Sequence, residues 1–139
     1  MPGPAAARDP AEAVLTLVER AAAHIQAVGR TRAFADFTRA DGGFVDGDLY
    51  IFCNAADGTV LAHGGNPKLV GKRLWTLRDP EGTATTAEID RIGRMQGHGW
   101  LTYLWPNPRL GRIQRKVVYV LRIDERTVCG SGYFKPDPP

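Results

Sequence analysis

The sequence predicts an α+β fold in which one long helix packs on a five-stranded antiparallel sheet. Three observations support this prediction. The 139 residues are enough for one domain with one hydrophobic core. Apolar residues near the N-terminus recur at steps of three and four, which is the period of a helix face. The second half contains stretches of β-forming residues separated by short turns, as in a sheet of neighbouring strands.

The first helix is predicted over Pro10–Val28. Asp9 can accept hydrogen bonds from the free amides, and proline suits the first helical position. Gly29 is a natural helix stop. At 1.5 Å per residue such a helix is roughly 28 Å long, enough to cross a whole sheet. A shorter helix is predicted over Thr31–Thr38.

Two strands are predicted next, over Asp48–Asn54 and Thr59–Ala62, joined by a tight turn at Asp57-Gly58. His63–Pro67 then reads as a loop, and a short helix is expected within Pro67–Leu77. A further helix begins at Thr85 or Thr86 and ends at Gln96. The remainder is predicted to form three antiparallel strands: Trp100–Trp105, Ile113–Ile123 and Thr127–Phe134.

The strand Ile113–Ile123 is apolar on both faces at its centre, so both faces of the sheet must be covered. The N-terminal helix can cover only one of them. We therefore expect the segment His63–Gln96 to lie over the other. Irregular segments pack less completely than a helix, and the gaps that they leave are where small molecules bind.

Lys116 is predicted to share one face of that strand with Val118 and Val120. In one interpretation the side chain extends to the sheet edge and stays solvated. In the other its ammonium group holds the carboxylate of a small ligand, since a lysine among apolar neighbours requires an anion or a path to water. The pattern alone favours the first.

Three aromatic residues lie within six positions of the strand Trp100–Trp105. Tyr103 and Trp105 should share a face, whereas Trp100 should point the other way. The turn that follows, Pro106-Asn107-Pro108, is stiff because two prolines flank the asparagine. Such a turn suits either a plain hairpin or a binding loop.

The net charge of +3 does not indicate a nucleic-acid partner, because cations alternate with acids along most of the chain. No apolar run is long enough to span a bilayer, and the N-terminus lacks the pattern of a signal peptide. The chain as written is therefore expected to be neither exported nor anchored, although a sequence trimmed of its signal would look the same.

No catalytic, metal or cofactor site is predicted. None of the three histidines stands in a metal or nucleophile motif, and the single serine, Ser131, lies between glycines without forming a nucleophile elbow. No glycine-rich phosphate loop precedes a helix. Cys53 and Cys129 lie far apart with no ligand spacing nearby, so we expect two buried free thiols.

A series of short motifs resembles the single Cache domain in the order that the family shows, over roughly residues 11–134. They are Phe44–Tyr50, Asp57–His63, Asn66-Pro67 to Gly71-Lys72, Asp79–Gly82, Gly99–Tyr103, Trp105–Pro108, Lys116–Val120 and Gly130–Tyr133.

The resemblance implies a PAS-like antiparallel sheet backed by a long helix, in a sensor module of the kind found in chemoreceptors and sensor kinases. Such domains are usually extracytoplasmic and typically bind small organic acids between the sheet and the segment that covers it. It also implies that the strands of Cys53 and Cys129 are adjacent, which permits a disulfide, although cross-strand bridges are uncommon and free thiols remain the expectation. The candidate ligand-binding residues are Lys116, Tyr103, Trp105, His63, Tyr50 and Asn107.

The leading hypothesis is a sensor domain over residues 9–135, with flexible ends, that binds a small organic carboxylate without a cofactor. Family members are commonly fused to transmembrane helices and a signalling output, which this chain lacks, so a receptor or a second copy of the chain is a possible partner. The alternative is a protein-interaction or dimerisation module in which the pocket is merely packed core.

Overall fold

The computed structural model describes residues 9–137. Residues 1–8 and 138–139 lie outside the described part, so the prediction that those ends are flexible is not tested there. The chain runs through three α-helices and seven strands in the described part.

The helices begin and end close to the predicted residues. They are α1 (Pro10–Val28), α2 (Arg30–Thr38) and α3 (Thr85–Gln96). The Asp9 carboxylate accepts a hydrogen bond from the Ala11 amide at 2.9 Å, as its capping position predicted. Gly97 ends α3 with a positive φ of 82°, a left-handed conformation that suits glycine.

The sheet has five antiparallel strands in the order β4-β3-β7-β6-β5. This confirms the predicted fold class, and the central place of β7 brings the last strand beside the first strand of the sheet. The strands are β3 (Phe52–Ala55), β4 (Val60–His63), β5 (His98–Asn107), β6 (Arg112–Asp124) and β7 (Thr127–Phe134).

Three local predictions were wrong. The strand predicted over Asp48–Asn54 is divided, because Tyr50 pairs with Val45 in a separate two-stranded sheet of β1 (Val45–Asp46) and β2 (Leu49–Tyr50). His63 is the last residue of β4, paired with Phe52, and not part of a loop. The short helix expected within residues 67–77 is only a 3₁₀ turn, η2 (Pro67–Leu69).

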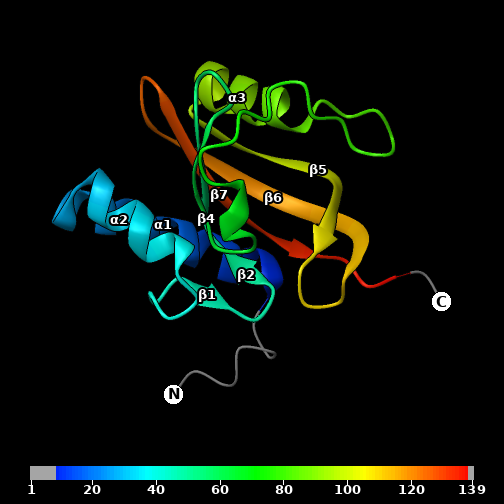
Figure 1. Ribbon diagram of the computed structural model, residues 1–139, viewed down its shortest axis with the longest axis horizontal. Coiled ribbons are helices and arrows are strands. Elements are labelled where there is room, and N and C mark those ends of the chain that lie inside the picture. Colours follow the sequence, from blue (N-terminus) through cyan, green and yellow to red (C-terminus); the bar gives the residue numbers. More distant parts are fainter. Residues whose placement is uncertain (1–8, 138–139) are drawn as a thin grey trace.

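Figure 1 shows α1 and α2 on one side of the sheet, with α3 and the segment before it on the other. As expected from the two-sided apolar pattern of β6, each face has its own hydrophobic cluster. The α1 side is built on residues such as Val14, Val18, Phe37, Ile51, Cys53 and Cys129. The α3 side is built on Phe52, Ile89, Ile92, Tyr103, Val118, Val120 and Val128.

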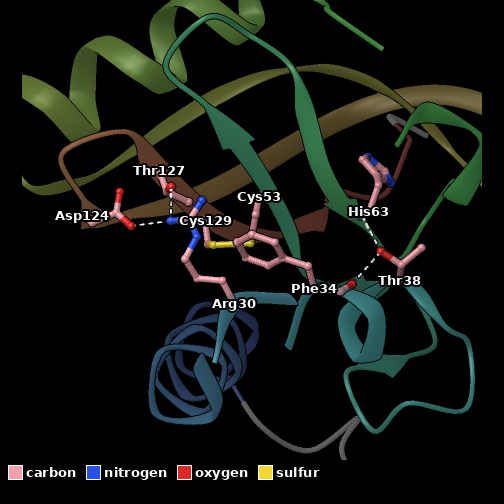
Figure 2. Close-up of a disulfide and its surroundings, with 8 residues drawn as sticks. All are labelled: Arg30, Phe34, Thr38, Cys53, His63, Asp124, Thr127 and Cys129. Atoms are coloured by element: carbon pink, nitrogen blue, oxygen red, sulfur yellow. Dashed lines mark hydrogen bonds and ion pairs between the residues drawn. A yellow bond between two sulfur atoms is a disulfide. The ribbon is translucent and has the colours of Figure 1, made fainter. Parts of the chain in front are cut away.

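A disulfide joins Cys53 of β3 to Cys129 of β7 (Figure 2), so the expectation of free thiols was wrong. The two residues stand directly opposite each other on neighbouring antiparallel strands, which places their side chains on the same face. Close by, the Arg30 guanidinium of α2 pairs with Asp124 and donates to the Thr127 hydroxyl at 2.6 Å. The disulfide ties β3 to β7, and the Arg30 contacts tie α2 to the adjoining ends of β6 and β7.

Within residues 9–137, no helix combines the length and the apolar character required to cross a membrane.

Candidate functional site

Lys116 lies at the centre of the candidate site, on the face of β6 that α3 and its preceding segment cover. Only 1% of its surface is exposed, so the side chain is buried and does not reach solvent along the sheet edge. Its Nζ donates a hydrogen bond to the Tyr50 hydroxyl at 2.9 Å. The same atom lies 4.1, 5.7 and 5.2 Å from the ring centroids of Tyr50, Phe52 and Phe134. The ammonium group is therefore held mainly by aromatic faces.

Burial lowers the pKa of Lys116 to about 7, and the negative charge of Asp48 offsets only part of this effect. Asp48 is itself engaged, because its carboxylate pairs with the Arg109 guanidinium at 2.8 Å. Lys116 belongs to none of the ion pairs within residues 9–137. A buried ammonium group without a carboxylate partner is destabilising, and an anion that reached it would be bound strongly.

His63 is the second polar group of the site and is 5% exposed. Its Nδ1 accepts a hydrogen bond from the Asn66 amide at 2.8 Å. Burial, and then the charge of Lys116, lower the pKa of His63 to about 3, so the ring is neutral near pH 7. Because Nδ1 is the acceptor, the proton lies on Nε2, which is then a donor. The His63 amide donates to the Thr38 hydroxyl at 3.1 Å (Figure 2), which anchors this end of β4 to α2.

Tyr103 and Trp105 of β5 complete the aromatic wall. Trp105 stacks on His63 with ring centroids 6.0 Å apart, and it meets Tyr103 edge to face at the same distance. Tyr103 is 3% exposed, and burial raises the pKa of its hydroxyl well above the ordinary value. The hydroxyl stays protonated at all ordinary pH values and is available as a donor.

These groups surround a small inner compartment of about 20 Å³. The volume is sufficient for about one water molecule. None of the lining residues in the described part of the chain is acidic, so the compartment offers donors and a cation to an anion. The lining residues are Phe52, Asn54, Val60, His63, Leu74, Thr85, Thr86, Ile89, Tyr103, Trp105 and Lys116.

A second, larger cavity of about 400 Å³ adjoins the inner compartment, and we call it the outer cleft. Leu74, Thr85 and Trp105 line both spaces and form the wall between them. The outer cleft lies between β5 and the segment that precedes α3. Its other lining residues are Tyr50, Gly65, Asn66, Leu69, Leu77, Arg78, Asp79, Pro80, Leu104, Pro106, Pro108 and Ile113.

Two glycines make the close packing around Lys116 possible. A Cβ at Gly132 of β7 would lie 2.5 Å from the Val117 carbonyl oxygen and 3.1 Å from the Lys116 Cε. A Cβ at Gly65 would lie 2.4 Å from the Tyr50 ring. Any larger residue at these positions would push the lysine or the tyrosine out of place, so both glycines shape the site.

The structure brings together five of the six predicted residues: Lys116, Tyr103, Trp105, His63 and Tyr50. Asn107 is buried but lines neither cavity. Its amide donates to Gln114 at 2.8 Å, and its oxygen accepts from the Arg109 amide at 3.0 Å, so the side chain holds the β5–β6 turn.

Sequence reasoning missed three polar residues of the inner compartment: Asn54, Thr85 and Thr86. Asn54 is a polar side chain in an apolar strand, two residues after Phe52 and so on the same face, which was a usable signal. The two threonines stand at the start of α3, where hydroxyl residues are ordinary capping candidates and gave no separate signal. Across residues 9–137, no three acidic, histidine or cysteine side chains gather closely enough to hold a metal ion.

Comparison with known families and proteins gives consistent results. The family described as Single Cache domain 2 matches residues 10–129. The methyl-accepting chemotaxis protein McpP of Pseudomonas putida is 32% identical over 93 residues, which are 66% of this chain. The matched region is 17% of that receptor's length.

Solved structures share the fold over nearly the whole chain. A methyl-accepting chemotaxis protein from Vibrio parahaemolyticus has a TM-score of 0.79 at 20% identity, covering 88% of this chain and 86% of its own. A periplasmic sensor domain of a chemotaxis protein has a TM-score of 0.72 at 29% identity, covering 90% of both. A Cache chemosensory domain described with the structural basis for carboxylic acid recognition has a TM-score of 0.76 at 24% identity, covering 90% of this chain and 92% of its own.

Proposed function

Because the chain belongs to the single Cache domain 2 family, we propose that it is a sensor domain whose ligand is a small organic carboxylate. The observation that carries the proposal is Lys116, a buried ammonium group beside three aromatic rings and one hydroxyl, with no carboxylate partner among residues 9–137. The ligand's carboxylate takes the place of the missing anion.

The neighbouring donors are arranged for the same task. His63 and Tyr103 line the inner compartment together with Lys116, and both are neutral donors at ordinary pH. A charge-assisted hydrogen bond contributes about 1.5–3 kcal/mol, which is a factor of ten or more in affinity. Binding also raises the pKa of Lys116, because a nearby negative charge favours the charged form of the amine.

The relatives support the same function at the level of their descriptions. One is a chemotaxis receptor, and one structural neighbour is a Cache domain that recognises a carboxylic acid. By analogy, this domain acts in chemotaxis-type sensing, where occupancy of the site alters the state of a receptor. Lys116 is the residue through which the carboxylate is recognised.

The test is a calorimetric titration of the purified chain with monocarboxylates of two to four carbons. We expect binding that Lys116→Met weakens at least tenfold, because the substitution keeps the aliphatic length and removes the charge. Lys72→Met is the matched control, since Lys72 is exposed and lines neither cavity. Titrations without heat for any acid, or affinities that Lys116→Met and Lys72→Met change equally, would contradict the proposal.

A further inference from the structure

The free space of the site is divided unevenly between its charged and apolar parts. The inner compartment beside Lys116 holds about 20 Å³, whereas the outer cleft holds about 400 Å³. The first volume accommodates about one water molecule. The second falls within the usual range of small-molecule sites, roughly 300–1,000 Å³. A carboxylate group, with three heavy atoms, is larger than one water molecule, so an acid bound at Lys116 must extend from the inner compartment toward the outer cleft.

The two spaces are separated by single side chains. Tyr50 lines the outer cleft, and its hydroxyl accepts the hydrogen bond from Lys116. Trp105 lines both spaces and stacks on His63. A carboxylate held by Lys116 therefore lies one side chain away from the cleft, and the rest of its molecule enters the cleft when a side chain of the dividing wall rotates aside.

Most of the outer cleft is suited to hydrocarbon. Most of its wall is leucine, proline, isoleucine and tryptophan. Its one acid, Asp79, is engaged: one oxygen accepts from the Glu81 and Thr83 amides and the other from the Leu104 amide, at 2.8–2.9 Å. Arg78 donates to the Gly82 carbonyl at 2.8 Å. Asp79 thus holds the backbone around the cleft, whereas the exposed Arg78 guanidinium belongs to none of the ion pairs within residues 9–137.

The geometry points to an amphipathic monocarboxylate as the ligand, with its carboxylate at Lys116 and a hydrocarbon or aromatic tail in the outer cleft. This inference rests on the proposed function and narrows it. Acids with longer tails bind more tightly than acetate or propionate, because each added methylene leaves water for an apolar wall.

The experiment is a calorimetric series with acetate, butanoate, hexanoate and octanoate. The inference predicts an affinity gain of about twofold to fourfold per methylene, lower where the cleft is open to water.

Ile113→Asp tests the location of the tail. Ile113 lines the outer cleft and is 50% exposed, so the protein should tolerate the change. The variant should lose most of the gain for hexanoate and retain its affinity for acetate. Met95→Asp is the control, because this substitution introduces the same charge away from the site. Met95 is 71% exposed on α3 and lines neither cavity.

The outcomes separate the two proposals. Short acids could bind in a way that depends on Lys116, while affinity stays constant or falls as the tail lengthens. That result would overturn the assignment of the tail to the outer cleft and leave the proposed function standing. Equal losses in Ile113→Asp and Met95→Asp for every acid would also overturn it. The absence of binding for every acid in the series would remove both.

Discussion

The two faces of the sheet are covered in different ways. On one face lie α1, α2 and the disulfide, and its cluster consists of apolar side chains such as Val14 and Val18, which are 0% and 1% exposed. On the other lie α3 and the irregular segment before it, and this face contains buried Lys116, Asn54 and Gln114 together with both cavities of the site. A regular helix fills the space over a sheet, whereas turns leave room that polar groups and a ligand can use.

This difference separates stability from binding. Substitutions on the helix-covered face should weaken folding and leave the affinity of the folded protein unchanged. Substitutions on the other face should change binding and pH dependence with smaller effects on stability.

Replacing both cysteines, Cys53→Ala with Cys129→Ala, should lower the free energy of unfolding by about 4 kcal/mol. The bridge closes a segment of 76 residues, and its loss gives the unfolded chain more freedom. Denaturant unfolding measures the effect. Reductant should destabilise the unsubstituted protein by a similar amount and have no effect on the variant. Equal stability of the variant and the oxidised protein would show that the bridge contributes nothing.

Leu17→Ala should lower the free energy of unfolding by about 3 kcal/mol, because the residue is buried against the sheet and its removal leaves a cavity. Leu15→Ala on the same helix should cost less than half as much, since Leu15 is only half-buried. Affinity for a carboxylate should be the same in both variants. A large loss of affinity in Leu17→Ala would break the division between the two faces.

Lys116→Met should remove a rise in stability with pH. The folded pKa is about 7 and the unfolded pKa about 10.5, so between these values the unfolded chain binds more protons, and stability increases with pH. From pH 7 to 9.5 we expect a rise of about 3 kcal/mol in the ligand-free protein and none in the variant. This window lies below the titration of Tyr50 and Tyr103, whose pKa values burial raises. The same dependence of stability on pH in both proteins would contradict the lowered pKa of buried Lys116.

His63→Gln should reduce the loss of folding stability at acidic pH. The folded pKa is about 3 and the unfolded pKa about 6.5, so the contribution of the neutral ring is complete above pH 6.5 and is lost as pH falls toward 3. Between pH 6.5 and 4.5 the variant should lose about 1–2 kcal/mol less than the unsubstituted protein. Glutamine retains an acceptor for the Asn66 amide. If the free energy of unfolding fell equally with pH in both proteins, a group other than His63 would be responsible for the acid sensitivity.

Much of the fold could be predicted because local signals agreed with the tertiary structure. The Asp9 cap and Gly29 bounded α1 at the observed residues. The alternation of β6 placed Lys116 on the face with Val118 and Val120, and the structure shows all three buried there. The structure also separates Trp100, which packs on Tyr119, from Tyr103 and Trp105 on the opposite face, as alternation predicted.

The missed features depend on partners distant in sequence. Nothing in the run Asp48–Asn54 shows that Tyr50 pairs with Val45 while Phe52 joins another sheet. The disulfide depends on the register of strands 76 residues apart. The burial of Lys116 was ambiguous from its own strand, since it depends on Tyr50 and Phe134 covering the ammonium group.

The central claim is that a buried ammonium group receives the ligand's carboxylate. Its most direct test is an NMR titration of the Lys116 side chain, followed through its labelled ε-carbon, with and without a bound monocarboxylate. We expect a pKa near 7 for Lys116 in the ligand-free protein and a higher value in the complex. An unshifted pKa near 10.5 that is the same in both states would contradict it.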